Sequence, residues 1–258
     1  MPYLDDDGGP LRVIPITQAP ADGRFFQLNR RIGFQEHAGA PIYWAPPHIP
    51  SDDPQPGNRT DLASVPWIFW SFIGSFGRQS APAIVHDHRC ELALALPRDQ
   101  ALEQRFEDDR VFRVGLRQQK MPLFRSWLMW AFVSVERYFR HAPGRFTMLV
   151  IQSAIGIAMI VAAVILGIVA HPLWLLLALV PAVAALLWRR ERRLMIWLAY
   201  SGALLAPVIA VQFAAVGVFR LIELLVRETI DRPFVDHEPG PVITPLRFDP
   251  RRSGQPRG

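Results

Sequence analysis

A stretch of 24 residues without a single charge, at positions 147–170, constrains the fold more than any other feature of this sequence. As an α-helix it would be about 36 Å long at about 1.5 Å per residue, and the hydrocarbon core of a bilayer is about 30 Å thick. The stretch also has no polar face to turn toward water. We therefore expect a transmembrane helix at residues 147–170.

Two more apolar runs follow, at residues 173–188 and 194–219, so the predicted transmembrane region covers residues 146–222 and contains three helices. Four arginines separate the last two runs: Arg189, Arg190, Arg192 and Arg193. By the positive-inside rule this loop is expected in the cytoplasm, together with everything that precedes the first helix. The sequence thus predicts a multi-pass protein of a bacterial inner membrane with a cytoplasmic N-terminal domain.

The end of the chain leaves one alternative open. Pro207 lies inside the third apolar run, and a break there would turn that run into a re-entrant hairpin. The side of the membrane on which the C-terminal tail lies is therefore not determined. We expect residues 223–258 to form a polar tail that is partly disordered.

Residues 1–145 have the composition of a soluble domain, with 17 Lys and Arg against 16 Asp and Glu. Such a segment is long enough to bury a core. Because its charges nearly balance, the net charge of +5 for the whole chain does not indicate a nucleic-acid partner. Cys90 is the only cysteine, which excludes an intrachain disulfide and fits a reducing compartment.

The soluble domain is expected to be α+β. Alternating apolar positions at 11–17, 24–34 and 42–44 predict short strands of one small, irregular β-sheet. Cap and proline signals then predict helices at residues 62–76, 80–96 and 99–118, the last two forming a hairpin around Pro97. A small sheet and a helical hairpin, followed by an α-helical transmembrane region, is the predicted fold.

The hairpin gives a geometric reason to suspect a site. His86 lies 11 residues before Pro97 and Asp109 lies 12 residues after it. Two antiparallel helices with the same rise per residue place these side chains at about the same height. We expect an imidazole on one helix to face a carboxylate on the other, with Asp108 or Glu107 as the partner if the rotation differs by a residue or two.

Each candidate residue has a catalytic and a structural interpretation. In the catalytic one, His86 is a general base, Asp109 orients it, Asp61 is a further carboxylate beside it, and Asp87 is a ligand to a divalent cation. In the structural one, His86 and Asp87 are buried polar groups that tie the hairpin to the sheet, and Asp61 or Ser64 caps a helix. The sequence leaves both open.

The motifs resemble a known family. The order Thr60-Asp61-x-Ala63-Ser64-x-Pro66, then His86-Asp87, then Asp109-x-x-Phe112 is similar to a phage- and prophage-associated domain of unknown function, number 1353. The resemblance covers about residues 20–140 and implies a short soluble domain without an established activity. Two positions depart from the family pattern, Leu62 and His88, and neither change removes an ionisable group.

The His-Asp pair also bears a more distant similarity to bacterial phospholipases of the A2 type, which carry His-Asp on one helix and Asp-x-x-Phe on the next. That similarity implies that His86 activates water, Asp109 orients the imidazole and Asp87 binds calcium. The chain departs from these enzymes in lacking their disulfides and their glycine-rich calcium loop.

Two functions are therefore expected from the sequence. The first is a membrane-tethered His/Asp hydrolase that acts on membrane lipid or another ester. The alternative is a non-catalytic, phage-derived, membrane-associated assembly or interaction module whose protein partners the sequence does not identify. A solvent-open cleft at His86 would favour the enzyme, and burial without a cavity would favour the module.

Overall fold

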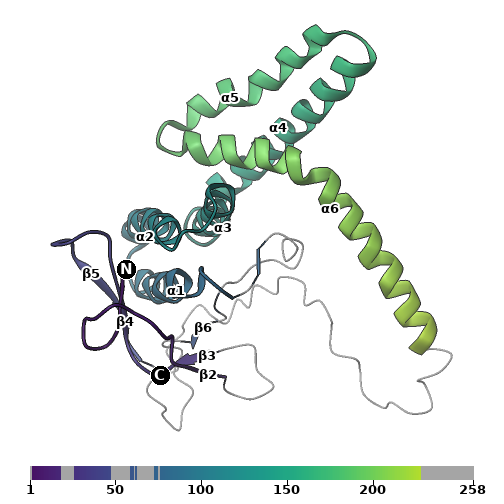
Figure 1. Ribbon diagram of the computed structural model, residues 1–258. Helices are drawn as coiled ribbons and strands as arrows, with labels where there is room; N and C mark the ends of the chain where they lie inside the picture. Colours follow the sequence, from purple (N-terminus) through teal and green to yellow (C-terminus); the bar gives the residue numbers. More distant parts are fainter. Residues whose placement is uncertain are drawn as a thin grey trace.

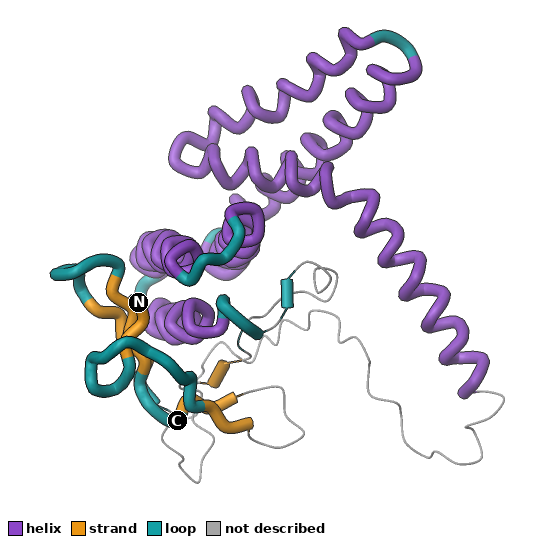
Figure 2. Tube along the Cα trace, viewed as in Figure 1, coloured by secondary structure: helices purple, strands orange, loops and turns teal. Residues whose placement is uncertain are grey.

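The computed structural model describes residues 2–18, 26–47, 59–60, 62, 73–74 and 76–227. Within them the fold is α+β, as predicted: short strands come first and helices make up the remainder (Figure 1, Figure 2). Most of the predicted helix at residues 62–76 and the tail beyond residue 227 lie outside the described residues.

The strands form two antiparallel sheets of three strands each, where one sheet was expected. Their orders are β1-β4-β5 and β2-β3-β6. The strands are β1 (Tyr3–Leu4), β2 (Ile16–Gln18), β3 (Phe26–Leu28), β4 (Ile32–Gln35), β5 (Ile42–Ala45) and β6 (Arg59–Thr60). The segment at 24–34 was predicted as one unit, but a bend at Asn29 and Arg30 divides it into β3 and β4, which join different sheets.

Three helices follow the strands: α1 (Ser80–Leu94), α2 (Arg98–Gln118) and α3 (Leu123–His141). The predicted hairpin of α1 and α2 is confirmed, with Pro97 at the N-cap of α2, where its missing N–H costs no hydrogen bond. The main core lies between this hairpin and the strands. Its members include Tyr3, Leu28, Ile32, Phe34, Ile84, Val85 and Val111, all less than a tenth exposed.

The apolar half of the chain folds back on itself. Helix α4 (Pro143–Val169) runs out, and a return leg made of η2 (Pro172–Leu179), α5 (Val180–Ala185) and η3 (Leu186–Glu191) lies beside it (Figure 1). The backbone turns sharply at Arg189, whose φ is 45° and ψ is −99°, and continues into α6 (Arg192–Val226). Helix α6 is continuous through Pro207, so this proline does not create a re-entrant hairpin.

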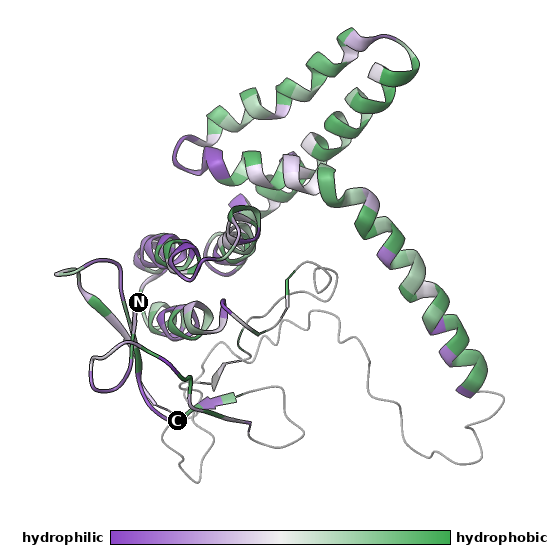
Figure 3. Ribbon diagram, viewed as in Figure 1, coloured by the Kyte–Doolittle hydropathy of each residue, from purple (hydrophilic) through white to green (hydrophobic). Residues whose placement is uncertain are grey.

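Two helical stretches are long and apolar enough to cross a membrane by length and composition, Pro143–Val169 and Pro172–Val226. Only 22% and 11% of their most apolar windows are buried, whereas the core helix of a soluble protein would be mostly covered. In Figure 3 most of these two stretches is coloured as hydrophobic, and the turn before α6 is coloured as hydrophilic. This pattern suggests association with a membrane.

Candidate functional site

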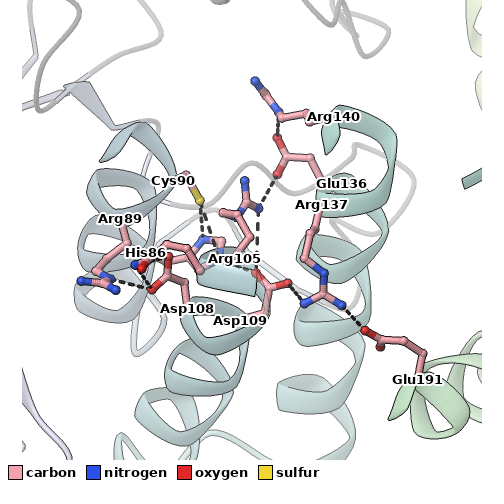
Figure 4. A network of polar contacts seen from close by, with 11 residues as sticks. His86, Arg89, Cys90, Arg105, Asp108, Asp109, Glu136, Arg137, Arg140 and Glu191 are labelled. Atoms are coloured by element: carbon pink, nitrogen blue, oxygen red, sulfur yellow. Dashed lines mark hydrogen bonds and ion pairs between the residues drawn. The ribbon is translucent and has the colours of Figure 1, made fainter. Parts of the chain in front are cut away.

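The predicted encounter between His86 and Asp109 is present. His86 of α1 and Asp109 of α2 meet across the hairpin, with Nε2 of the imidazole 2.9 Å from Oδ1 of the carboxylate (Figure 4). His86 is 6% exposed and Asp109 is 0% exposed. The two residues lie at nearly equal distances from Pro97, 11 and 12 residues, which explains the contact because both helices rise by the same amount per residue.

Asp109 is held by more than the imidazole. Its second oxygen, Oδ2, accepts a hydrogen bond from Nη1 of Arg137 on α3 at 2.7 Å, and Nη2 of Arg105 lies 3.8 Å from Oδ1. Burial by itself would raise the pKa of Asp109, but the hydrogen bond from His86 and the charges of Arg137 and Arg105 keep that pKa below its ordinary value. The carboxylate is therefore ionised at neutral pH.

Arg137 extends this network to the apolar half of the chain. Its Nη2 donates to Oε1 of Glu191, which precedes α6, at 2.8 Å, and the hydroxyl of Tyr138 donates to the same oxygen at 2.9 Å. Burial and the charge of Glu191 raise the pKa of Tyr138 to about 12, so the phenol keeps its proton. A continuous buried chain thus joins α1, α2, α3 and the start of α6 (Figure 4).

The other nitrogen of the imidazole faces a thiol. Sγ of Cys90, one turn further along α1, is 3.5 Å from Nδ1 of His86. Burial raises the pKa of Cys90, so the thiol is neutral at physiological pH. A cavity of about 10 Å³, bounded by His86, Arg89 and Asp108 among others, lies against the ring and has room for about one water molecule. The described surroundings of His86 are closed and contain no open cleft.

Asp87, the next residue of α1, bonds a residue of the sheet. Its Oδ2 accepts a hydrogen bond from the hydroxyl of Thr60 at 2.8 Å, and Oγ1 of Thr60 accepts one from the backbone N–H of Leu62 at 2.9 Å. The Thr-Asp and His-Asp motifs therefore touch through Thr60 and Asp87, which tie β6 to α1. Asp61 and Ser64 lie outside the described residues.

The phospholipase similarity implies that Asp87 binds calcium, which requires further oxygen ligands close to its carboxylate. In the described part of the chain, no group of three or more His, Cys, Asp or Glu side chains is placed to hold a metal ion. Calcium normally takes six to eight oxygen ligands. The role of Asp87 as a metal ligand stays a prediction, without a donor set among the residues that the structure places.

Asp108 and Glu107, the alternative partners that the sequence offered for His86, bond other residues. Asp108 accepts a 2.6 Å hydrogen bond from Nε of Arg89 and a longer one from Gln104, while Glu107 pairs with Arg110. A change of one position rotates a helical side chain by about 100°, which is why Asp109 and not Asp108 meets His86. Burial raises the pKa of Asp108, in contrast to that of its neighbour.

Several members of the network did not stand out in the sequence. Arg137 is one of several arginines near the end of an apolar helical segment, and nothing in the sequence distinguishes it from them, yet it is 1% exposed. Glu191 was hidden within a run of arginines, and no local signal marked it as their buried exception. Cys90 was detectable, because a residue four positions after His86 lies on the same helix face.

Comparisons with known proteins add a family but no activity. No curated protein and no solved structure matched this chain. Residues 54–133 match the family model described as "Protein of unknown function (DUF1353)". That match spans the Thr-Asp and His-Asp motifs and supports the DUF1353 family for this segment of the chain.

Proposed function

We propose that this protein is a membrane-anchored, non-catalytic module of phage-derived type whose soluble domain is fixed to its membrane helices by a buried ionic chain. The observation that carries the proposal is the position of Arg137, which bonds Asp109 in the soluble hairpin and Glu191 at the start of α6. A side chain that bridges the two halves resists their separation, because breaking either bond would leave a buried charge without its partner.

The surroundings of His86 favour this role over catalysis. A general base needs a ring nitrogen within reach of water or substrate, whereas Nε2 is bonded to Asp109 and Nδ1 faces a neutral thiol. Thr60 and Asp87 similarly form a structural tie between strand and helix. The motif residues that the structure describes thus have packing partners of their own.

In this proposal the protein spans a bacterial inner membrane more than once and its N-terminal domain lies in the cytoplasm. The outward-facing apolar surfaces of α4 and α6 support the membrane location. The arginines around the turn at Arg189 support a cytoplasmic position for the base of the helices. A reporter enzyme that is active only outside the cytoplasm tests the orientation: it should be active when fused after Ala170, at the end of α4, and inactive when fused after Arg193, at the start of α6.

A second candidate function is a His/Asp hydrolase acting on lipid or another ester. The 2.9 Å bond between His86 and Asp109 and the water-sized cavity against the imidazole favour it. In that reaction His86 would take a proton from a water molecule in the cavity, and Asp109 would stabilise the resulting imidazolium. Opening of the closed surroundings would have to precede substrate binding.

One substitution separates the two functions. His86→Gln keeps an N–H donor near Asp109 but removes the base. Full-length protein in lipid nanodiscs should show the same background rate of phospholipid and ester hydrolysis before and after this change, with or without divalent cations. A wild-type rate that falls about 100-fold or more in His86→Gln would overturn the non-catalytic proposal and establish the hydrolase.

A further inference from the structure

An aromatic cluster occupies the junction of the soluble and apolar halves. Trp127 of α3 stacks on Trp197 of α6 with ring centroids 5.4 Å apart and planes 8° from parallel. Trp130 meets Trp127 edge-on at 5.1 Å. Trp127 and Trp197 are both half-buried, so part of this tryptophan cluster (Trp127, Trp130 and Trp197) reaches the surface. Tryptophan is enriched where a protein crosses the membrane–water interface.

Two arginines border the tryptophan cluster. The guanidinium carbon of Arg113 on α2 lies 4.3 Å from the ring centroid of Trp127 and 5.9 Å from that of Trp130. Arg193 is exposed and lies four residues before Trp197, on the same face of α6. The arginines come from α2 and α6, and the indole rings come from α3 and α6.

Arg113 and Arg193 have no acidic partner among the described residues, unlike Arg110 and Arg190. Arg110 is paired with Glu36 and Glu107, and Arg190 is paired with Glu103. Nε of Arg113, by contrast, is buried without a hydrogen-bond partner. Burial, followed by the nearby positive charges of Arg193 and Arg110, lowers the pKa of Arg113.

We propose that Arg113 and Arg193, together with the tryptophan cluster, bind the phosphate group of an anionic phospholipid. Guanidinium groups recognise phosphate oxygens with paired N–H donors, and the indole rings fix the plane of Arg113. The acyl chains would lie along the exposed apolar surface of α4, whose first turns pack in the same apolar cluster as the tryptophans. A free phosphate ion would gain nothing from that surface.

The inference rests on the membrane location proposed above but not on whether His86 is catalytic. It is tested with the full chain in detergent micelles, by native mass spectrometry during titration with phosphatidylglycerol, phosphatidylcholine or inorganic phosphate. Wild-type protein should bind phosphatidylglycerol about tenfold more tightly than phosphatidylcholine, and Arg113→Gln or Arg193→Gln should weaken that binding about tenfold. Inorganic phosphate should bind only weakly.

Arg190→Gln is the matched control, because it removes one charge from the same boundary but from an arginine that already has a carboxylate partner. The affinity of the Arg190→Gln protein for phosphatidylglycerol should stay within about twofold of that of the wild type. Equal losses in Arg190→Gln and Arg193→Gln would overturn the site in favour of diffuse attraction. Equal affinity for phosphate ion and lipid would overturn the lipid assignment.

Two further measurements keep the result interpretable. Arg113→Lys retains the charge without the paired donors, so it should recover only part of the affinity if the protein is folded and the site is real. Full recovery would contradict recognition by a guanidinium. Fractionation of cell membranes tests the location separately: protein that binds lipid in micelles but is not found in membranes would refute the proposed location and leave the site standing.

Discussion

Asp109 and Arg137 form a buried ion pair in which Nη1 of the arginine lies 2.7 Å from Oδ2 of the aspartate. The arginine side chain is 1% exposed and the aspartate side chain is 0% exposed. Desolvating two charges is expensive, and the cost is offset only when each has several partners. Here the aspartate also meets His86, and the arginine also meets Glu191. The pair therefore holds together helices that are distant in the sequence.

Asp109→Asn should destabilise the protein by about 3–5 kcal/mol, because it leaves the charge of Arg137 buried with only Glu191 to balance it. The measurement is thermal or denaturant unfolding of purified protein in micelles. Glu103→Gln is the control, since its ion pair with Arg190 is exposed and should be worth at most about 1 kcal/mol. Equal effects of the two changes would show that the buried network is not a principal source of stability.

Acidification should weaken the contribution of Asp109. Its pKa is held below the ordinary value of 3.8, so the ionised form stabilises the folded protein above about pH 4, and this contribution is lost as the pH falls through the lowered pKa. The stability difference between wild type and Asp109→Asn should be constant from pH 7 to about 5 and shrink below pH 4. A difference that grows on acidification would contradict this sign.

Gly115→Ala should cost about 1–3 kcal/mol of folding free energy. A Cβ at position 115 would overlap the hydroxyl of Tyr3, a residue of β1 whose side chain is buried against α2. Gly144→Ala, at an exposed helical position with nothing within 4 Å of the added carbon, should instead be neutral or stabilise by up to about 1 kcal/mol. Unfolding of the two variants side by side checks the docking of β1 on α2.

Cys90 should react slowly with maleimide in the folded protein, because burial raises its pKa above the ordinary value of 9.0 and leaves little thiolate at pH 8. Labelling followed by mass spectrometry should be about tenfold slower than in the unfolded chain. Fast labelling of the native protein that disappears in His86→Gln would instead mean that the imidazole activates the thiol.

The local spacing of residues was enough to predict much of this protein. Helical rise and period depend only on nearby residues, so they can be applied to the sequence directly. They predicted a long apolar helix at 147–170, a helical hairpin around Pro97, and His86 and Asp109 at about the same height in that hairpin. The α+β class could be predicted for the same reason. Continuity of α6 through Pro207 could not, because neighbouring groups decide whether a proline bends or ends an apolar helix.

The closed surroundings of His86 were decided by the tertiary structure alone. Arg137 and Glu191 are 54 residues apart, and nothing in either neighbourhood marks them as buried partners. Their pairing depends on how α3 docks against α2 and against the turn before α6, and so does the meeting of Arg113 with Trp127. The sequence does not show which ionisable groups become buried next to one another, because packing decides that. Burial removes water from a charged group, and the group then needs a charged or hydrogen-bonding partner.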